Sequence, residues 1–121
     1  MSHRILIVDD EPNIVISLEY LMKKEGFEIA VATDGEAALK LAAEFRPDLI
    51  LLDVMMPKKS GFEVCESLRA DPAQAGVKII MLTAKGRETE VTKGLALGAN
   101  TYITKPFSTK DLIAQIKSLL A

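Results

Sequence analysis

The sequence of 121 residues is poor in cysteine, histidine and aromatic residues: it holds one cysteine, one histidine and no tryptophan. Cys65 cannot form an internal disulfide, and a thiol within an apolar helical pattern is typical of a small buried hydrophobic side chain. The scarcity of imidazole and thiol ligands disfavours softer metals. These absences favour a reducing, cytoplasmic setting.

The chain also lacks a large excess of one charge and lacks a long hydrophobic run. Its formal net charge is -2, whereas affinity for phosphate backbones requires clustered excess lysine and arginine. No apolar stretch approaches membrane-spanning length, and residues 1–4 lead into a short apolar run without a signal-peptide core. We therefore expect a soluble intracellular protein that contacts neither membrane nor, by itself, nucleic acid.

Hydrophobic residues make up 49% of the chain and are concentrated in short segments that predict β-strands. Most of these segments are rich in Ile, Val and Leu without polar alternation, which is typical of parallel strands covered on both faces. The segments are residues 5–8, 29–32, 49–52, 77–82 and 101–104. Between them lie segments with helical spacing; the last has an apolar stripe formed by Leu112, Ile113, Ile116, Leu119 and Leu120. The alternation predicts an α/β fold, a doubly wound parallel sheet of five βα units, with one domain over residues 1–121.

Residues that begin helices support these boundaries. Thr33 and Glu36 have the spacing of a capping box, in which a hydroxyl and a carboxylate bond the free amides of a first helical turn. Ser60 and Glu63 repeat this spacing before the third expected helix. Pro12 suits the first turn of the first helix, where no amide donor is needed.

Glycines mark the ends of two helices and weaken one of them. Gly26 and Gly98 lie where the first and fourth helices should end, ready for a left-handed conformation. The fourth expected helix, residues 87–97, has a thin apolar stripe and contains Gly94, which costs about 1 kcal/mol relative to alanine. We expect it to be the loosest helix.

The expected carboxyl ends of the strands carry the groups most suited to chemistry. In open parallel sheets with right-handed crossovers, functional groups gather beyond these ends. The residues there are Asp9, Asp10, Glu11, Asp53, Thr83, Ala84, Lys105 and Pro106. Three aspartate carboxylates, a hydroxyl and an ammonium are therefore expected to converge on one edge of the sheet.

Carboxylates that lie close together repel one another unless they hold protons or share a cation. Oxygen ligands in this number suit a hard ion such as Mg²⁺, which binds one or two carboxylates together with waters and phosphate oxygens. A carboxylate beside such a metal can attack phosphorus to form an acyl phosphate. Lys105 and the metal can neutralise the phosphoryl charge, and Thr83 can donate a hydrogen bond to a phosphoryl oxygen.

Each residue alone also has an ordinary structural interpretation. The acids at 9–11 fit solvated residues at a helix N-terminus, and Asp53 fits a turn residue at a strand end. Thr83 fits a capping hydroxyl, Lys105 a surface charge, and Tyr102 packing at a strand position. Because four separate strand ends bring complementary groups to one edge, we favour a common site over chance convergence.

Four segments carry motifs that occur together in a known family. They are residues 5–11 (ILIVDDE), 52–57 (LDVMMP) with Gly61, 82–84 (LTA) and 98–107, which runs from Gly98 and Ala99 through Tyr102 to Lys105, Pro106 and Phe107. Over essentially its full length the chain resembles the receiver domains of response regulators in two-component signalling, chemotaxis regulators among them. The resemblance implies the flavodoxin-like strand order 2-1-3-4-5.

The resemblance further implies a phosphoprotein that acts as a signalling switch. Asp53 accepts a phosphoryl group from the phosphohistidine of a sensor histidine kinase or phosphotransfer protein. Mg²⁺ is the implied cofactor, bound directly by Asp10, Asp53 and the main-chain oxygen of Met55, and through water by Asp9. Such a protein catalyses its own phosphorylation and slow dephosphorylation and is not otherwise an enzyme.

By the same resemblance, Lys105 pairs with phosphoryl oxygens and its peptide bond to Pro106 is cis, while the main-chain N–H of Ala84 contacts the phosphoryl group. Thr83 turns toward the phosphoryl group and draws Tyr102 inward. A downstream effector protein then reads the change on the face made by the fourth helix, the fifth strand and the fifth helix. Because its apolar stripe is thin and it contains Gly94, we further expect the fourth helix to move on activation.

Three alternative functions fit parts of the pattern. A flavodoxin-like electron carrier needs a loop rich in Ser, Thr and Gly after the first strand, where this chain has three acids. A phosphatase with an aspartate nucleophile usually needs a second aspartate two residues on, where Met55 stands. A receiver-like interaction module that is not phosphorylated is the alternative of a different class; such forms typically lack an acid or the lysine, and this chain has both.

Overall fold

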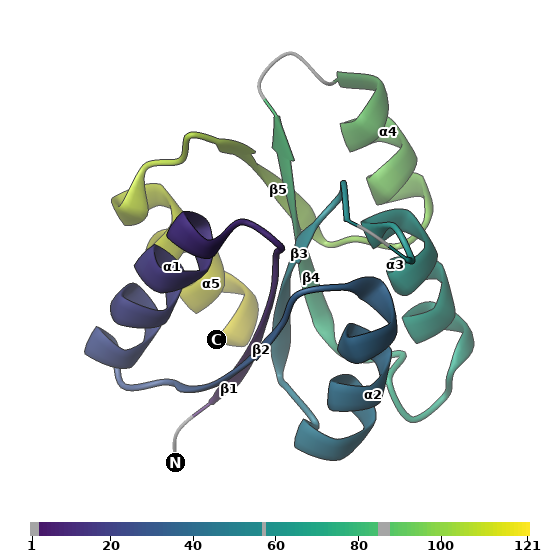
Figure 1. The fold of residues 1–121 in the computed structure, drawn as a ribbon, viewed down its shortest axis with the longest axis horizontal. Helices are drawn as coiled ribbons and strands as arrows, with labels where there is room; N and C mark the ends of the chain where they lie inside the picture. Colours follow the sequence, from purple (N-terminus) through teal and green to yellow (C-terminus); the bar gives the residue numbers. More distant parts are fainter. Residues whose placement is uncertain (1–2, 57, 85–87) are drawn as a thin grey trace.

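The computed structural model describes residues 3–56, 58–84 and 88–121, in which five strands alternate with five helices (Figure 1). In chain order the elements are β1 (Arg4–Val8), α1 (Pro12–Lys24), β2 (Glu28–Ala32), α2 (Gly35–Phe45), β3 (Leu49–Asp53), α3 (Gly61–Ala70), β4 (Lys78–Ala84), α4 (Glu88–Ala96), β5 (Thr101–Lys105) and α5 (Thr109–Leu120). The expected start of the fourth helix at residue 87 and the motif residue Pro57 lie outside the described residues.

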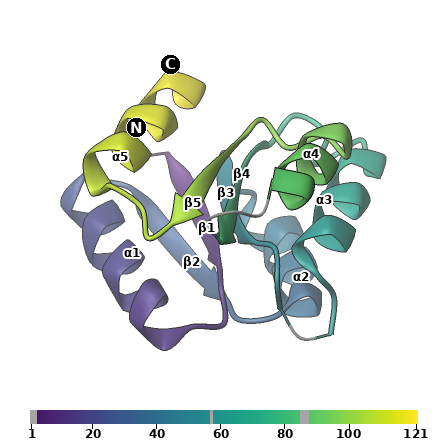
Figure 2. The same cartoon turned by 90° about the horizontal axis from the view of Figure 1, so that it is seen from above.

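The strands form one parallel sheet in the order β2-β1-β3-β4-β5, which confirms the expected doubly wound fold. Helices α1 and α5 cover one face of the sheet, and α2, α3 and α4 cover the other (Figure 2). The strand order reverses between β1 and β3, so the residues that end these two strands lie beside each other at the switch point. Among the described residues, no helix has the length and apolar character needed to cross a membrane.

Except at their ends, the central strands are apolar because both of their faces pack against helices. On β1, Leu6 and Val8 belong to the core shared with α2 and α3, whereas Ile5 and Ile7 belong to the core shared with α1 and α5. All four side chains are fully buried. Strands held in this way give little freedom to the groups at their ends.

Most of the predicted helix boundaries are confirmed. Pro12 is the first residue of α1, and Ser60 forms a capping box with Glu63 at the start of α3. Gly26 and Gly98 follow α1 and α4 with φ of 86° and 114°, the left-handed region in which glycine avoids a steric penalty.

The predicted capping box of Thr33 and Glu36 is wrong. Helix α2 is capped by Asp34, whose carboxylate accepts a hydrogen bond of 2.8 Å from the main-chain N–H of Ala37. Aspartate and threonine are both good N-caps, and the spacing rule alone could not decide between neighbouring candidates. Thr33 is exposed and precedes the helix by two residues.

Three strands run further than predicted, and their extensions carry site residues. Strands β3, β4 and β5 end at Asp53, Ala84 and Lys105, whereas the sequence predicted ends at residues 52, 82 and 104. Thr83 is paired in register with Thr104, and Ala84 with Lys105. Main-chain pairing continues past the last apolar side chain because it does not depend on side-chain polarity.

Two glycines allow α3 and its preceding loop to approach neighbouring main chain. A Cβ atom on Gly61, the first residue of α3, would overlap the main-chain oxygen of Asp53, and one on Gly35 would overlap the main-chain oxygen of Lys59. The N–H of Gly61 also donates to the main-chain oxygen of Val54 over 2.9 Å. Glycine at 61 therefore fixes where α3 begins relative to Asp53.

Candidate functional site

The predicted edge groups come together at the carboxyl ends of four strands. Asp9 and Asp10 follow β1, Asp53 and Lys105 end β3 and β5, and Thr83 lies next to the end of β4. A cavity of about 150 Å³ opens there, and its lining residues are Asp10, Glu11, Asp53, Val54, Met55, Leu82, Thr83, Ala84, Glu90 and Lys105. Because its walls come from several elements, the cavity exists only in the folded chain.

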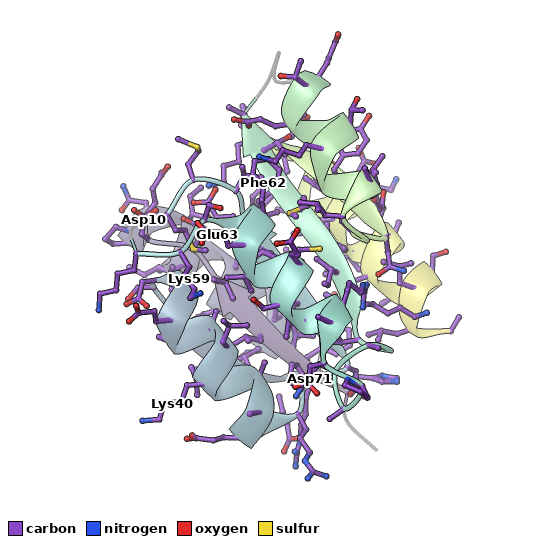
Figure 3. The ribbon with its side chains drawn as sticks, turned by 90° about the vertical axis from the view of Figure 1, so that its right-hand side faces the viewer. Asp10, Lys40, Lys59, Phe62, Glu63 and Asp71 are labelled. Carbon is purple, nitrogen blue, oxygen red and sulfur yellow. The ribbon has the colours of Figure 1, made fainter. Side chains whose placement is uncertain are left out.

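Three carboxylates meet at this edge in different environments. Asp9 is fully buried, Asp53 is 6% exposed, and Asp10 is exposed at the margin of the molecule (Figure 3). One oxygen of each carboxylate lies within 4.8 Å of the others. The other contacts of Asp9 restrict it further, since its Oδ1 accepts a hydrogen bond of 2.9 Å from the N–H of Glu11. The cluster presents oxygen ligands to a shared point, which is the arrangement that a hard divalent cation requires.

Lys105 pairs with the two buried carboxylates. Its Nζ lies 2.8 Å from Asp9 Oδ2 and 3.3 Å from Asp53 Oδ1. Burial by itself lowers the pKa of this lysine, but the hydrogen bond to Asp9 and the charges of Asp53 and Asp9 outweigh burial and raise the pKa above its ordinary value. The lysine is therefore a cation at neutral pH, and three carboxylates against one ammonium leave an excess of negative charge.

Burial and this excess charge both affect the pKa of Asp53. Burial, together with the negative charge of Asp9, raises the pKa of Asp53 from 3.8 to about 6. The charge of Lys105 and hydrogen bonds from Lys105 and the main chain of Met55 offset part of the rise. At neutral pH Asp53 is still ionised in the main, so it remains available as a nucleophile or metal ligand.

Thr83 contributes a buried hydroxyl with unused bonding capacity. The residue is 2% exposed, and its Oγ1 has no hydrogen-bond partner among the described residues. Leaving such a group unpaired costs about 1–3 kcal/mol, so native proteins rarely keep one without a reason. A ligand oxygen in the adjacent cavity would satisfy it.

Tyr102 lies apart from the residues that converge. It is on the edge strand β5, is 41% exposed, and lines a separate groove between β5 and α5 that also includes Gln115. The peptide bond between Lys105 and Pro106 is cis, as the resemblance implied. Of the predicted site residues, Tyr102 lies on the surface. The structure brings the others together: Asp9, Asp10, Asp53, Met55, Thr83, Ala84 and Lys105.

The sequence analysis missed one residue that lines the cavity. Glu90 of α4 lines the cavity, but nothing in its spacing showed that α4 lies over the end of β4.

We predict that Asp53→Asn stabilises the protein in metal-free buffer at about pH 8, by roughly 1–3 kcal/mol, because it removes a buried charge beside Asp9. The folded-state pKa of about 6 lies above the ordinary 3.8, so the wild-type protein gains stability as the pH falls through this interval. The advantage of the variant should therefore shrink toward about pH 4. Urea unfolding at several pH values measures both effects, and a variant less stable than wild type at high pH would contradict the prediction.

Comparison with known proteins finds similarity along most of the chain. A family model described as response regulator receiver domain matches residues 5–117. The alkaline phosphatase synthesis transcriptional regulatory protein PhoP of Bacillus subtilis is 48% identical over 120 residues, which cover 99% of this chain and 49% of that protein. The chain spans about half the length of this curated relative, and transcriptional regulation is named for the longer protein.

Two solved structures show the same fold over nearly all of their length. A putative response regulator from Chloroflexus aurantiacus matches with a TM-score of 0.96 and 34% identity, over 99% of this chain and 98% of the other. The receiver domain of sensor histidine kinase PA1611 from Pseudomonas aeruginosa matches with a TM-score of 0.90 and 28% identity, over 98% of each chain. That protein was solved with a magnesium ion coordinated in its active-site cleft.

Proposed function

The chain belongs to the response regulator receiver domain family, and from this premise we propose that it is a phosphorylation switch with Asp53 as the phosphoryl acceptor. The observation that carries the proposal is a cavity in which the carboxylate of Asp53 lies beside two further aspartates, the ammonium of Lys105 and an unpaired hydroxyl. We take residues 1–121 as one receiver domain.

In the proposed reaction, a carboxylate oxygen of Asp53 attacks the phosphorus of a phosphohistidine on a sensor histidine kinase or phosphotransfer protein. The new oxygen–phosphorus bond forms as the phosphorus–nitrogen bond breaks, and the electron pair stays on the imidazole nitrogen, which takes up a proton. Later attack by water at the same phosphorus releases inorganic phosphate and restores the carboxylate. The chain thus catalyses changes in its own phosphorylation and has no separate substrate to turn over.

The donor set fits Mg²⁺ as the cofactor. Three carboxylate oxygens lie within 4.8 Å of one another, and Lys105 offsets only part of their charge. Asp10, Asp53 and the main-chain oxygen of Met55 hold the ion directly in this proposal, whereas Asp9 acts through water because Glu11 N–H and Lys105 already engage its two oxygens. Mg²⁺ held by these residues would supply positive charge that offsets the charge of the phosphoryl oxygens.

The remaining site residues bind the oxygens of the phosphoryl group on Asp53. Lys105 now divides its charge between two carboxylates; once Asp53 carries a phosphoryl group, the ammonium can bond the phosphoryl oxygens instead. The hydroxyl of Thr83 and the main-chain N–H of Ala84 donate to the same oxygens, both from the end of β4. The buried hydroxyl of Thr83 gains the partner that it lacks among the described residues.

Phosphorylation is proposed to change the surface formed by α4, β5 and α5. As Thr83 turns toward the phosphoryl group, Tyr102 moves inward from its exposed position on β5. This movement reshapes the groove between β5 and α5, where an effector protein can detect it. The switch therefore converts a local charge change into a change of surface shape.

The phosphodonor requires its own contact surface near the cavity. Ile16 and Tyr20 on α1 are 64% and 69% exposed, and their four-residue spacing places them on one face of the helix. Helix α1 begins directly after the site residues Asp10 and Glu11. Large exposed apolar side chains are typical of a protein-binding surface, and these two lie on the helix that follows the site residues, so we propose that the donor docks here.

Incubation with Mg²⁺ and labelled acetyl phosphate tests the central proposal. We expect acid-stable, hydroxylamine-labile label that depends on Mg²⁺, because acyl phosphates react with hydroxylamine. Asp53→Asn should abolish the label, whereas Asp111→Asn, an exposed carboxylate on α5, should retain it. Undiminished label in Asp53→Asn would refute the assignment, and a folded wild-type chain that takes no label would instead support the unphosphorylated interaction module.

The docking surface predicts different responses to two phosphodonors. Ile16→Ser should slow transfer from a phosphorylated histidine protein roughly tenfold, since an exposed apolar anchor contributes 1 kcal/mol or more at such interfaces, and should leave labelling by acetyl phosphate unchanged. Leu95 is also an exposed apolar residue, but it lies on α4. Leu95→Ser is therefore the matched control and should behave as wild type toward both donors. Equal slowing with both donors would show that the substitution damages the site itself.

A further inference from the structure

The carboxyl-terminal end of α4 is tied to α3 through the side chain of Arg69. The guanidinium donates to the main-chain oxygens of Gly98, Ala75 and Val77 over 2.9, 2.9 and 2.6 Å. It also donates to Asn100 Oδ1 over 2.9 Å. One half-buried cation therefore joins α3, the segment before β4 and the junction between α4 and β5.

Asn100 extends this connection to β4. Its Oδ1 accepts a second hydrogen bond, of 2.8 Å, from the N–H of Ile79, while its own N–H donates to the Ile79 oxygen over 2.9 Å. The Sγ of Cys65 on α3 contacts the main-chain oxygen of Leu97 at 3.7 Å. Residues 97–100 are thus bonded to both α3 and β4.

Gly98 leaves room for the arginine in this arrangement. Its φ is 114°, and a Cβ atom there would lie 2.8 Å from Arg69 Cγ. Glycine is required twice, for its conformation and for the close passage of the Arg69 side chain. We call Arg69, Gly98 and Asn100 the clamp.

The middle of α4 is held by contacts of a different kind. Gly94 is the buried residue of the helix, and a Cβ there would lie 3.2 Å from Met81 Cγ on β4. The ammonium of Lys93 lies 4.5 Å from the ring centre of Phe62, at the first turn of α3 (Figure 3). Packing over a glycine and an exposed cation–π contact allow small shifts more readily than a fork of charged hydrogen bonds.

We propose that the clamp is a pivot: it holds the carboxyl-terminal end of α4 in place, so that the helix reorients about residues 97–100 when the state of Asp53 changes. The inference rests on the proposed function and assigns Arg69 and Asn100 as positioning residues. They lie at the far end of α3 from Phe62 and line no part of the Asp53 cavity.

Amide hydrogen exchange, with and without Mg²⁺ and beryllofluoride as a phosphoryl mimic, tests the pivot. In the wild-type protein, the mimic should change exchange at residues 88–94 roughly tenfold or more and at residues 97–100 less than about twofold. Arg69→Met should speed exchange at residues 97–100 roughly tenfold without any ligand, because charged hydrogen bonds are lost. In that variant the response to the mimic should spread into residues 97–100, which a purely structural role would not produce.

The controls separate the clamp from general stability. Arg4 is a matched arginine, because it donates to the main-chain oxygen of Phe45 and to the carboxylate of Glu28 on the β2 side of the sheet. Arg4→Met should leave amide exchange at residues 97–100 unchanged. Arg69→Lys keeps the charge without the fork and should restore protection only in part. If Arg69→Met does not fold, Asn100→Ala removes the shared acceptor and gives the same comparison.

Two results would overturn the pivot: equal responses to the mimic at residues 88–94 and 97–100 in the wild-type protein, or unchanged exchange in Arg69→Met. Labelling of Asp53 by acetyl phosphate, measured on the same samples, should stay within about twofold of wild type, since the clamp lies outside the cavity. A wild-type chain that is neither labelled nor changed by the mimic would refute both the proposed function and the pivot. The ligand-free comparison of Arg69→Met with the wild-type protein would still show whether the clamp protects residues 97–100.

Discussion

The pairing of Lys105 with Asp9 and Asp53 is the interaction on which the site depends. The residues before the two aspartates, Val8 and Leu52, are paired in register and fully buried, so the carboxylates cannot move apart to relieve their repulsion. Lys105 comes from β5, across β4, and its ammonium lies 2.8 and 3.3 Å from them. Because this compensation is incomplete, burial and the charge of Asp9 still raise the pKa of Asp53 to about 6. A fold that keeps uncompensated negative charge at a fixed place provides a site for a cation, and a carboxylate for that cation to orient.

Strand β4 connects the cavity to the surface through a few neighbouring residues. Thr83, whose hydroxyl is buried, is two residues from Met81 on β4, and Met81 packs beneath Gly94 of α4. Met81 is also paired in register with Tyr102 on the edge strand. A change at the end of β4 can thus reach both α4 and the exposed aromatic side chain without a long chain of contacts. The bonds between α3 and residues 97–100 lie at the other end of α4, and the proposed pivot rests on this difference between the two ends of the helix.

The sequence predicted the fold, and it predicted which side chains the structure brings to one edge of the sheet, because both follow from patterns along the chain. Apolar runs without alternation identified the strands, and the residues after Val8 and Leu52 marked the edge where Asp9 and Asp53 meet. Side-chain contacts between distant segments could not be predicted from patterns along the chain. No spacing rule indicates that Lys105 reaches Asp9, or that Arg69 and Asn100 bond each other, since both pairs depend on the final placement of elements. The capping error at Thr33 has a local cause, because two adequate N-caps stand next to each other there.

In the proposed switch Asp53 itself becomes an acyl phosphate, and the modified residue can be identified chemically. Borohydride reduces an aspartyl phosphate to homoserine, so the protein is treated with Mg²⁺ and acetyl phosphate, reduced, digested and sequenced by mass spectrometry. We expect homoserine at position 53, formed only when both Mg²⁺ and the phosphodonor are present, and unchanged aspartate at positions 9 and 10. Homoserine at position 9 or 10, or unmodified Asp53 in a folded and magnesium-bound protein, would contradict it.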